Sequence, residues 1–249
     1  MLSGSAATAL RAPRPGSSVR WVSSALRSSY VAHLVGRRDV GGGMTLFAFD
    51  VPGALRESYL RPGQYSYFTL IGEAGYFVLG SREGRSPWEI LLRRGGGAAD
   101  LLMKAPVGTD VGATPALGGG FPVESARGEN ALVVVTAGAL AAARAVVGRR
   151  VEDGDAARTR LIVGARTIDT VPLEDELDAM RAAGVRVRIV LSGSDAPAEY
   201  DRGYVQHVLE RDWTDRPWVF VAGAPEMVTG VRTAALALGA DARRIVSNA

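Results

Sequence analysis

The stretch that most constrains this chain of 249 residues is ALVVVTAGALAAARAVVG, residues 131–148. Residues 131–135 are apolar and rich in β-branched valine, which predicts a strand buried on both faces. A turn of small residues, Thr136-Ala137-Gly138, follows, and residues 139–147 are good helix formers. Such a turn exposes the first N–H groups of a helix, where a pyrophosphate can bind. An ordinary buried strand–helix unit fits the same pattern, so the choice between it and a phosphate-binding turn depends on motifs elsewhere in the chain.

The composition excludes several kinds of chemistry. There is no cysteine, which removes disulfides, thiolate catalysis, cysteine-ligated zinc and iron–sulfur clusters. Only two histidines occur, His33 and His207, too few for a histidine-rich metal site. We therefore assign no catalytic side chain and no metal ligand. No apolar run approaches the roughly 18 residues that a membrane-spanning helix needs, so no membrane-spanning segment is predicted.

The excess of basic residues is confined to the start of the chain. The sequence has 29 Lys and Arg against 26 Asp and Glu. Residues 1–38 contain six arginines and no acidic residue, so the remainder carries 23 basic and 26 acidic side chains. No basic stripe with interleaved aromatic residues is present there, which argues against nucleic-acid binding.

Residues 1–29 are rich in Ser, Ala and Arg and have no acidic residue. This composition is typical of an organelle transit peptide and predicts a plastid or mitochondrial location. The alternative is a disordered extension, or a start codon assigned too early, in a cytoplasmic protein.

Residues 30–124 have the pattern of a small antiparallel β-barrel, because short apolar strands alternate with turn signals such as Pro52-Gly53 and Pro62-Gly63. The predicted strands are residues 30–35, 44–49, 64–71, 76–79 and 88–92. A helical turn is predicted over residues 99–103.

Residues 125–249 have a different pattern, in which strands alternate with helices. This alternation predicts a Rossmann-like domain with a parallel sheet. After the strand and helix of residues 131–148, we expect strands at residues 160–163, 185–191, 218–222 and 244–246. Helices are expected at residues 173–183, 203–211 and 225–238.

The ordered set of motifs from Tyr30 onward resembles the ferredoxin–NADP reductase superfamily. In the first domain, Pro62-Gly63-Gln64 resembles the family's PGQ entry to a barrel strand. The sequence GYFVLGS, residues 75–81, lies where the family has its flavin motif, Arg-x-Tyr-Ser. The sequence GGGA, residues 95–98, lies where it has a glycine-rich pyrophosphate loop.

The second domain contains four further motifs of this kind. The sequence TAGALAAAR, residues 136–144, takes the place of the family's GTGIAPLR turn. Gly164-Ala165-Arg166 resembles its GAR sequence, and residues 203–205 resemble its GYV helix start. The sequence AGAPEM, residues 222–227, resembles the family's CGPxxM motif.

This resemblance implies that the barrel binds FAD and that the second domain binds NAD(P)H. The implied flavin contacts are Tyr76, whose ring could lie on the isoalloxazine, with Phe77 and Val78 beside it. The implied contacts to the FAD pyrophosphate are the N–H groups of the glycine loop and a neighbouring arginine. They are Gly95, Gly96 and Gly97, with Arg93 or Arg94.

For the nicotinamide dinucleotide, the resemblance places the pyrophosphate at the turn of residues 136–138, with contacts from Thr136, Ala137 and Gly138. Arg166 would lie near the adenosine ribose or its 2′-phosphate, and Gly223 and Ala224 would line the nicotinamide pocket. Asp195, after a predicted strand, would repel a 2′-phosphate, so NADH is weakly preferred over NADPH.

Several positions depart from the family's motifs. Where the flavin motif has Arg and Ser, this chain has Ala74 and Phe77. The Phe77 ring could cover the flavin N5 or point into the barrel. Ala139 replaces a glycine of the nicotinamide turn, and Ala222 replaces the cysteine beside the nicotinamide.

Two functions therefore follow from the sequence. The favoured one is a flavin-dependent NAD(P)H oxidoreductase that passes electrons through FAD to an unknown acceptor, such as a redox partner protein. The alternative is a non-catalytic reductase-like subunit of a larger complex.

Overall fold

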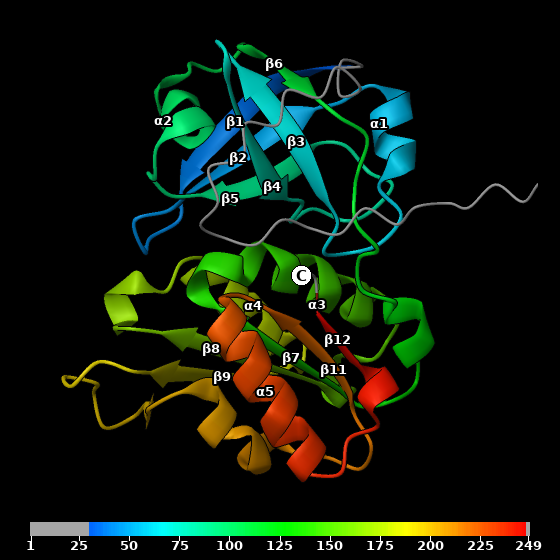
Figure 1. Ribbon diagram of the computed structural model, residues 1–249, viewed down its shortest axis with the longest axis vertical. Helices are drawn as coiled ribbons and strands as arrows, with labels where there is room; N and C mark the ends of the chain where they lie inside the picture. The colour runs from blue at the N-terminus through cyan, green and yellow to red at the C-terminus, as the bar shows by residue number, and fades with distance from the viewer. Residues whose placement is uncertain (1–29, 248–249) are drawn as a thin grey trace, which may run out of the picture.

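A computed structural model describes residues 30–247, which form two lobes stacked one above the other (Figure 1). The expected transit peptide, residues 1–29, lies outside the described residues. None of the helices in residues 30–247 has the length and apolarity that a membrane crossing needs.

The first lobe is a six-stranded antiparallel sheet in the order β4-β3-β6-β1-β2-β5. An isolated bridge between Leu79 and Ile90 brings the end of β4 to β5 and curls the sheet into a barrel. Its strands and helices are β1 (Tyr30–Asp39), β2 (Thr45–Asp50), α1 (Gly53–Ser58), β3 (Tyr65–Leu70), β4 (Glu73–Val78), β5 (Trp88–Leu92), α2 (Gly97–Lys104) and β6 (Asp110–Ala113).

Large side chains fill the barrel. Phe47, Phe49 and Phe68 point inward from β2 and β3, and Trp88 joins them from β5. Each is at most 1% exposed. Residues on these strands alternate between the barrel interior and the outer face, and on β2 and β5 the outward Leu46 and Leu91 are buried as well, against the second lobe.

The second lobe is a six-stranded parallel sheet in the order β10-β9-β8-β7-β11-β12. Because β7 lies between β8 and β11, the chain winds outward through β9 and β10, then returns to the other side of β7. The elements are β7 (Ala131–Thr136), α3 (Leu140–Glu152), β8 (Thr159–Ala165), α4 (Glu174–Ala182), β9 (Arg186–Leu191), β10 (Asp201–Arg202), β11 (Trp218–Ala222), α5 (Pro225–Ala237) and β12 (Ile245–Ser247).

Alternate residues of β7 face two different apolar layers. Val133 and Val135 pack with α3 and α4 on the side of the sheet toward the barrel, and Leu132 and Val134 pack with α5 on the other side (Figure 1). This burial on both faces is the reason that the strand is a continuous apolar run. The predicted fold class, a β-barrel followed by a parallel α/β domain, is confirmed.

The two lobes share one apolar core. Val40, Met44 and Leu91 of the barrel belong to the same buried cluster as Leu140 and Val133 of the parallel lobe. The contact is close: a Cβ built on Gly80 of the barrel would lie 3.1 Å from the Cβ of Ala141 on α3.

One predicted helix is wrong. Residues 203–211 form two 3₁₀ turns, Val205–His207 and Leu209–Asp212, and no α-helix. Val205 and Val208 are both buried in the apolar layer under α5. A spacing of three residues brings side chains to one face of a 3₁₀ turn and of an α-helix alike, so the apolar pattern does not distinguish the two. The structure also adds α1, a helix that the sequence did not indicate.

Candidate dinucleotide site

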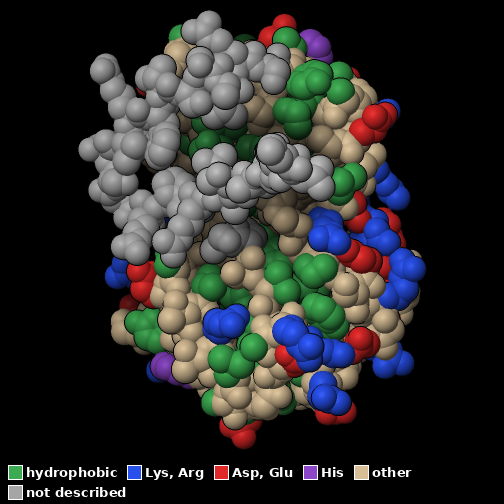
Figure 2. Space-filling view, turned by 45° about the vertical axis from the view of Figure 1, so that its right-hand side comes forward, with side chains coloured by type: hydrophobic (Ala, Val, Ile, Leu, Met, Phe, Trp, Pro, Cys, Tyr) green, Lys and Arg blue, Asp and Glu red, His purple; other side chains and the backbone are tan. Residues whose placement is uncertain are grey.

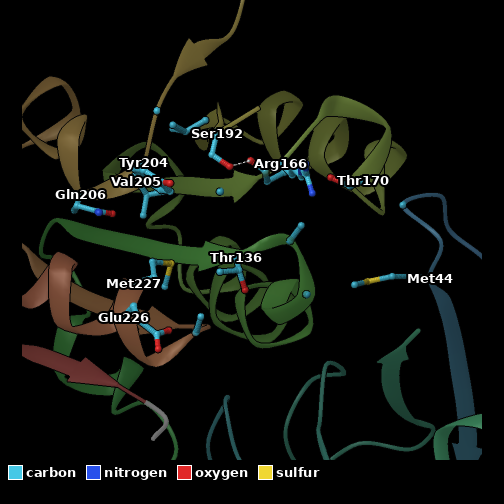
Figure 3. Close-up of a pocket in the computed structure, with 18 of the residues that line it drawn as sticks. Met44, Thr136, Arg166, Thr170, Ser192, Tyr204, Val205, Gln206, Glu226 and Met227 are labelled. Atoms are coloured by element: carbon cyan, nitrogen blue, oxygen red, sulfur yellow. Dashed lines mark hydrogen bonds between the residues drawn. The ribbon is translucent and has the colours of Figure 1, made fainter. Parts of the chain in front are cut away.

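A cavity of about 820 Å³ opens at the carboxyl ends of the parallel strands, where they face the barrel. Its walls come from the ends of β7, β8 and β9, from the start of α5, and from the barrel residues Gly42, Met44 and Arg93. Figure 3 shows Thr136 near the centre and Met44 reaching in from the barrel side. Ligands of open α/β sheets bind at this edge, beside the strand where the winding direction reverses, and β7 is that strand here.

The turn between β7 and α3 leaves the start of the helix open. Thr136, Ala137 and Gly138 all line the cavity. Helix α3 has no side-chain cap at its N-terminus and no acidic residue in its first turn. A 3₁₀ turn, Ala137–Ala139, leads into α3, and the Leu140 N–H donates to the carbonyl oxygen of Ala137. The N–H groups that begin this turn therefore carry the positive end of the dipole toward the cavity.

Small residues keep this region of the cavity open. A Cβ on Gly138 would lie 3.8 Å from the Cε of Met44, so a larger side chain would extend into the gap between the lobes. Gly223 has a φ of 151°, and a Cβ there would lie 2.8 Å from Cγ2 of Thr136. Glycine is thus required where the end of β11 approaches the end of β7.

Two arginines from different lobes line the cavity. Arg93 follows β5 of the barrel, and Arg166 follows β8 of the parallel lobe. Both are exposed, and among the described residues neither has a carboxylate partner within 4.0 Å. Glu226 at the start of α5 contributes a negative charge to the same cavity. An unpaired guanidinium is well suited to bind a phosphate with two parallel hydrogen bonds.

The cavity has lining residues that the sequence analysis did not assign to the site. Tyr204 and Gln206 follow β10 and enter it beside Val205 (Figure 3). The Tyr204 ring is 60% exposed and packs edge-on against His207. An exposed aromatic ring at the carboxyl edge of a sheet offers a surface for a base or nicotinamide ring. The GYV sequence contains this tyrosine, but the resemblance indicates only a helix start there.

The predicted dinucleotide residues converge. Thr136, Ala137, Gly138, Arg166 and Ala224 all line the cavity, and Gly223 directly precedes Ala224. Arg93, which the resemblance placed at the flavin phosphate, lines this cavity instead. In residues 30–247, no group of three or more His, Asp or Glu side chains gathers as a metal site.

On the barrel, Tyr76 lies on the outer face of the edge strand β4. Its ring centroid is 4.8 Å from that of Tyr67 and 5.6 Å from that of Tyr65. The side chain is 56% exposed, and partial burial, with its two tyrosine neighbours, raises its phenol pKa. These three rings, the tyrosine platform, form an exposed aromatic patch in which the Tyr76 ring is inclined by 51° to that of Tyr67 and by 83° to that of Tyr65.

The neighbours of Tyr76 point elsewhere. Phe77 packs into the barrel with its ring centroid 5.9 Å from that of Phe68, so the inward orientation holds for this residue. Val78 packs against the apolar core shared by the lobes. Neither side chain extends the tyrosine platform.

Two carboxylates from neighbouring elements, those of Asp100 and Glu73, lie at the glycine loop of residues 95–97. The Gly95 N–H donates a hydrogen bond to Oδ1 of Asp100, at 3.1 Å. Oε2 of Glu73 lies 3.3 Å from the position of a Cβ on Gly97. Arg94 is exposed beside the loop and does not line the cavity. On the barrel, the exposed ring of Tyr76 offers a surface for an aromatic ligand, but carboxylates lie at the glycine loop where the pyrophosphate of FAD would bind.

Comparisons with known proteins agree with this architecture. Residues 135–233 match the family model "Oxidoreductase NAD-binding domain". No match was found among curated proteins. Among solved structures, the FAD/NAD-binding domain of a nitric oxide dioxygenase from Vibrio cholerae matches with a TM-score of 0.78 at 16% identity, over 89% of this chain and 98% of that one.

A ferredoxin–NADP⁺ reductase from Neisseria gonorrhoeae, solved with bound FAD and NADP, matches with a TM-score of 0.72 at 18% identity, over 88% of this chain and 97% of that one. A ferredoxin reductase of carbazole 1,9a-dioxygenase matches with a TM-score of 0.76 at 18% identity, over 89% of this chain and 69% of that one. The chain has the fold of the ferredoxin–NADP reductase superfamily, as its motifs predicted, and its second lobe matches an NAD-binding oxidoreductase family.

Proposed function

We propose that this chain is an NAD(P)H oxidoreductase that binds the nicotinamide dinucleotide in the cavity between its lobes. The observation that carries the proposal is the open N-terminus of α3 in a cavity lined by Arg93 and Arg166. The positive end of a helix dipole and two exposed guanidiniums together suit a pyrophosphate.

The side chains around the cavity suggest how the ligand is oriented. The pyrophosphate lies on the turn at Gly138, with Arg93 closing over it from the barrel. The adenosine lies between Arg166 and the exposed ring of Tyr204. The nicotinamide, which supplies a hydride when bound, then lies beside Thr136 and Gly223, at the boundary with the barrel.

We propose NADH as the preferred dinucleotide. A 2′-phosphate adds negative charge, and Glu226 already contributes a carboxylate to the cavity, while Asp195 follows β9 nearby in the chain. Arg166 is the basic side chain of the parallel lobe that partly offsets these carboxylates.

Titration with NADH and NADPH, followed by tryptophan fluorescence or calorimetry, tests the binding site. We expect Arg166→Ala to weaken NADPH about tenfold or more, since the loss of a hydrogen bond to a charged group costs roughly 1.5–3 kcal/mol. We expect NADH to change much less. Arg158→Ala is the matched control, because Arg158 is exposed at the opposite end of β8. Equal affinities in Arg166→Ala and the wild type would remove Arg166 from the site.

The proposed hydride acceptor is a flavin whose ring lies on the tyrosine platform, and the flavin passes electrons on to a redox partner. Oxidation of NADH at 340 nm, with and without added flavin, measures this step. NADH binding without any flavin-dependent oxidation would contradict it.

A second candidate function is a nucleotide-binding subunit that holds the dinucleotide but no flavin, as part of a larger complex. The specific observation in its favour is that Glu73 and Asp100 lie at the glycine loop. A protein that binds NADH, takes up no flavin and oxidises no NADH would support this candidate.

A further inference from the structure

Helices α2 and α3 both begin at turns of small residues, but only α2 has a carboxylate that accepts a hydrogen bond from a backbone N–H group near its start. Helix α3 has no acidic residue in its first turn, whereas α2 has Asp100 in its first turn. Oδ1 of Asp100 accepts a hydrogen bond from the Gly95 N–H at 3.1 Å. One helix start is thus open to an added anion, and at the other an anionic side chain already occupies an N–H group.

A second carboxylate reinforces the difference at α2. Glu73 is the first residue of β4, and α2 packs along this strand and its neighbour β3. Its Oε2 atom lies 3.3 Å from the Cβ position of Gly97, the first residue of α2. A phosphate on this loop would therefore meet two negative charges at close range.

The neighbouring arginines, Arg93 and Arg94, do not neutralise the two negative charges at the glycine loop. Arg93 lines the cavity between the lobes and serves the dinucleotide site. Arg94 is one exposed cation against two carboxylates. On the outer face of the same strand β4, Tyr76 and its partners Tyr65 and Tyr67 still offer an aromatic surface.

We propose that Glu73 and Asp100 are specificity-determining residues that keep phosphate groups off the glycine loop. The barrel then takes a flavin ring without phosphates, of the riboflavin type, as an exchanging substrate in place of a retained FAD. This inference rests on the proposed function. The dinucleotide gives a hydride to the ring, and solvent supplies the one proton that completes the reduced flavin.

The experiment compares riboflavin, FMN and FAD by quenching of flavin fluorescence, at low and at raised salt. In the wild type we expect FAD to bind no more tightly than riboflavin. We expect FAD binding to strengthen as salt screens the two carboxylates, whereas an ordinary phosphate site weakens with salt. Riboflavin, which is uncharged, should show little dependence on salt.

The double variant Glu73→Gln/Asp100→Asn tests the residues themselves. Each removed charge at a helix start changes anion affinity by about two- to fivefold, so we expect FAD to bind about tenfold more tightly in the double variant. Riboflavin affinity should stay within about twofold. Glu57→Gln is the control, because α1 lies on the other side of the barrel from α2 (Figure 1).

Stoichiometric FAD in the purified protein would overturn the inference, as would a double variant that changes FAD and riboflavin equally. Failure of all three flavins to bind would overturn it as well. NADH titration separates these outcomes from a failure of the dinucleotide site, because it reports the other lobe independently.

Discussion

At Gly223 the backbone leaves β11 in a conformation that only glycine adopts readily, with a φ of 151°. The missing Cβ would lie 2.8 Å from Cγ2 of Thr136 and 2.9 Å from Cε of Met227. Both neighbours line the dinucleotide cavity. A single absent methyl group therefore determines how closely the ends of β7 and β11 approach at the proposed nicotinamide position.

We expect Gly223→Ala to raise the Kd for NADH about tenfold, because the new methyl group displaces Thr136 or Met227. The conformational strain alone costs roughly 1–3 kcal/mol of stability. Gly239→Ala carries a comparable strain, with a φ of 87° and no atom within 4 Å of the new Cβ. Calorimetric titration and thermal unfolding of both variants separate the effects. An unchanged NADH affinity in Gly223→Ala would contradict the assignment.

Arg150 fixes the connection between the lobes. It is fully buried on α3, donates hydrogen bonds to the carbonyl oxygens of Ala126 and Glu129, and lies 3.4 Å from the carboxylate of Asp155. Burial lowers its pKa, and the neighbouring carboxylates only partly offset this effect. The segment that joins barrel to sheet is thereby attached to the helix that forms the dinucleotide turn.

We expect Arg150→Met to lower the free energy of unfolding by about 3–5 kcal/mol, because Asp155 and two carbonyl groups lose a buried partner. The control Arg158→Met, at an exposed position just before β8, should change it by less than about 0.5 kcal/mol. Urea denaturation measures both. A loss below about 1 kcal/mol for Arg150→Met would show that the linker holds without this contact.

At the scale of elements, the pattern of apolar residues predicted those strands whose residues are buried. The valine run of β7 indicated a strand that is covered on both faces, and the turn signals Pro52-Gly53 and Pro62-Gly63 indicated where the apolar strands β2 and β3 end and begin. The helix predicted over residues 203–211 is wrong because the three-residue spacing of Val205 and Val208 fits one face of an α-helix and of a 3₁₀ turn equally, and the segment folds as two short 3₁₀ turns.

The candidate site also has some residues that the local sequence predicts and others that depend on contacts between distant parts of the chain. The turn at Thr136 to Gly138 could be predicted, because small residues between a buried strand and a run of helix formers are typical of a phosphate-binding turn. That Arg93 lines the cavity could not, because it depends on how the barrel docks against the sheet. The proximity of Glu73 to Gly97 likewise joins residues on different elements, and no local pattern marks it.

Across the whole molecule, ion pairs reinforce the shared apolar core. Arg38 of β1 pairs with Asp175 at 2.7 Å, and Arg82 of the barrel pairs with Glu152 of α3 at 2.7 Å. Arg144 of α3 reaches Glu89 of β5 at 3.0 Å. Figure 2 shows basic and acidic side chains gathered along one side of the boundary between the lobes.

These pairs predict an acid-sensitive boundary. Hydrogen bonds from Arg82 and Arg38 lower the pKa values of Glu152 and Asp175 below their ordinary values of 4.5 and 3.8. The folded protein thus binds fewer protons than the unfolded chain, so this stability is complete above about pH 5 and is lost as the pH falls through the lowered values. The carboxylates of both pairs are exposed to solvent, which screens the attraction and limits each pair to less than about 1 kcal/mol.

Urea denaturation between pH 7 and pH 3 measures this effect. We expect Glu152→Gln/Asp175→Asn to flatten the fall in stability below pH 5. The control Asp169→Asn/Glu210→Gln removes two exposed carboxylates that form no ion pair among the described residues and should keep the wild-type slope. Identical slopes in all three proteins would exclude these pairs as the source.

The close contact between Gly80 and Ala141 has a consequence for chimeras that combine one lobe of this protein with a lobe of another. A foreign barrel with a side chain at this position would place its Cβ 3.1 Å from that of Ala141, so it would dock on α3 only after a local shift of the two surfaces. A chimera that carries both surfaces together avoids this shift.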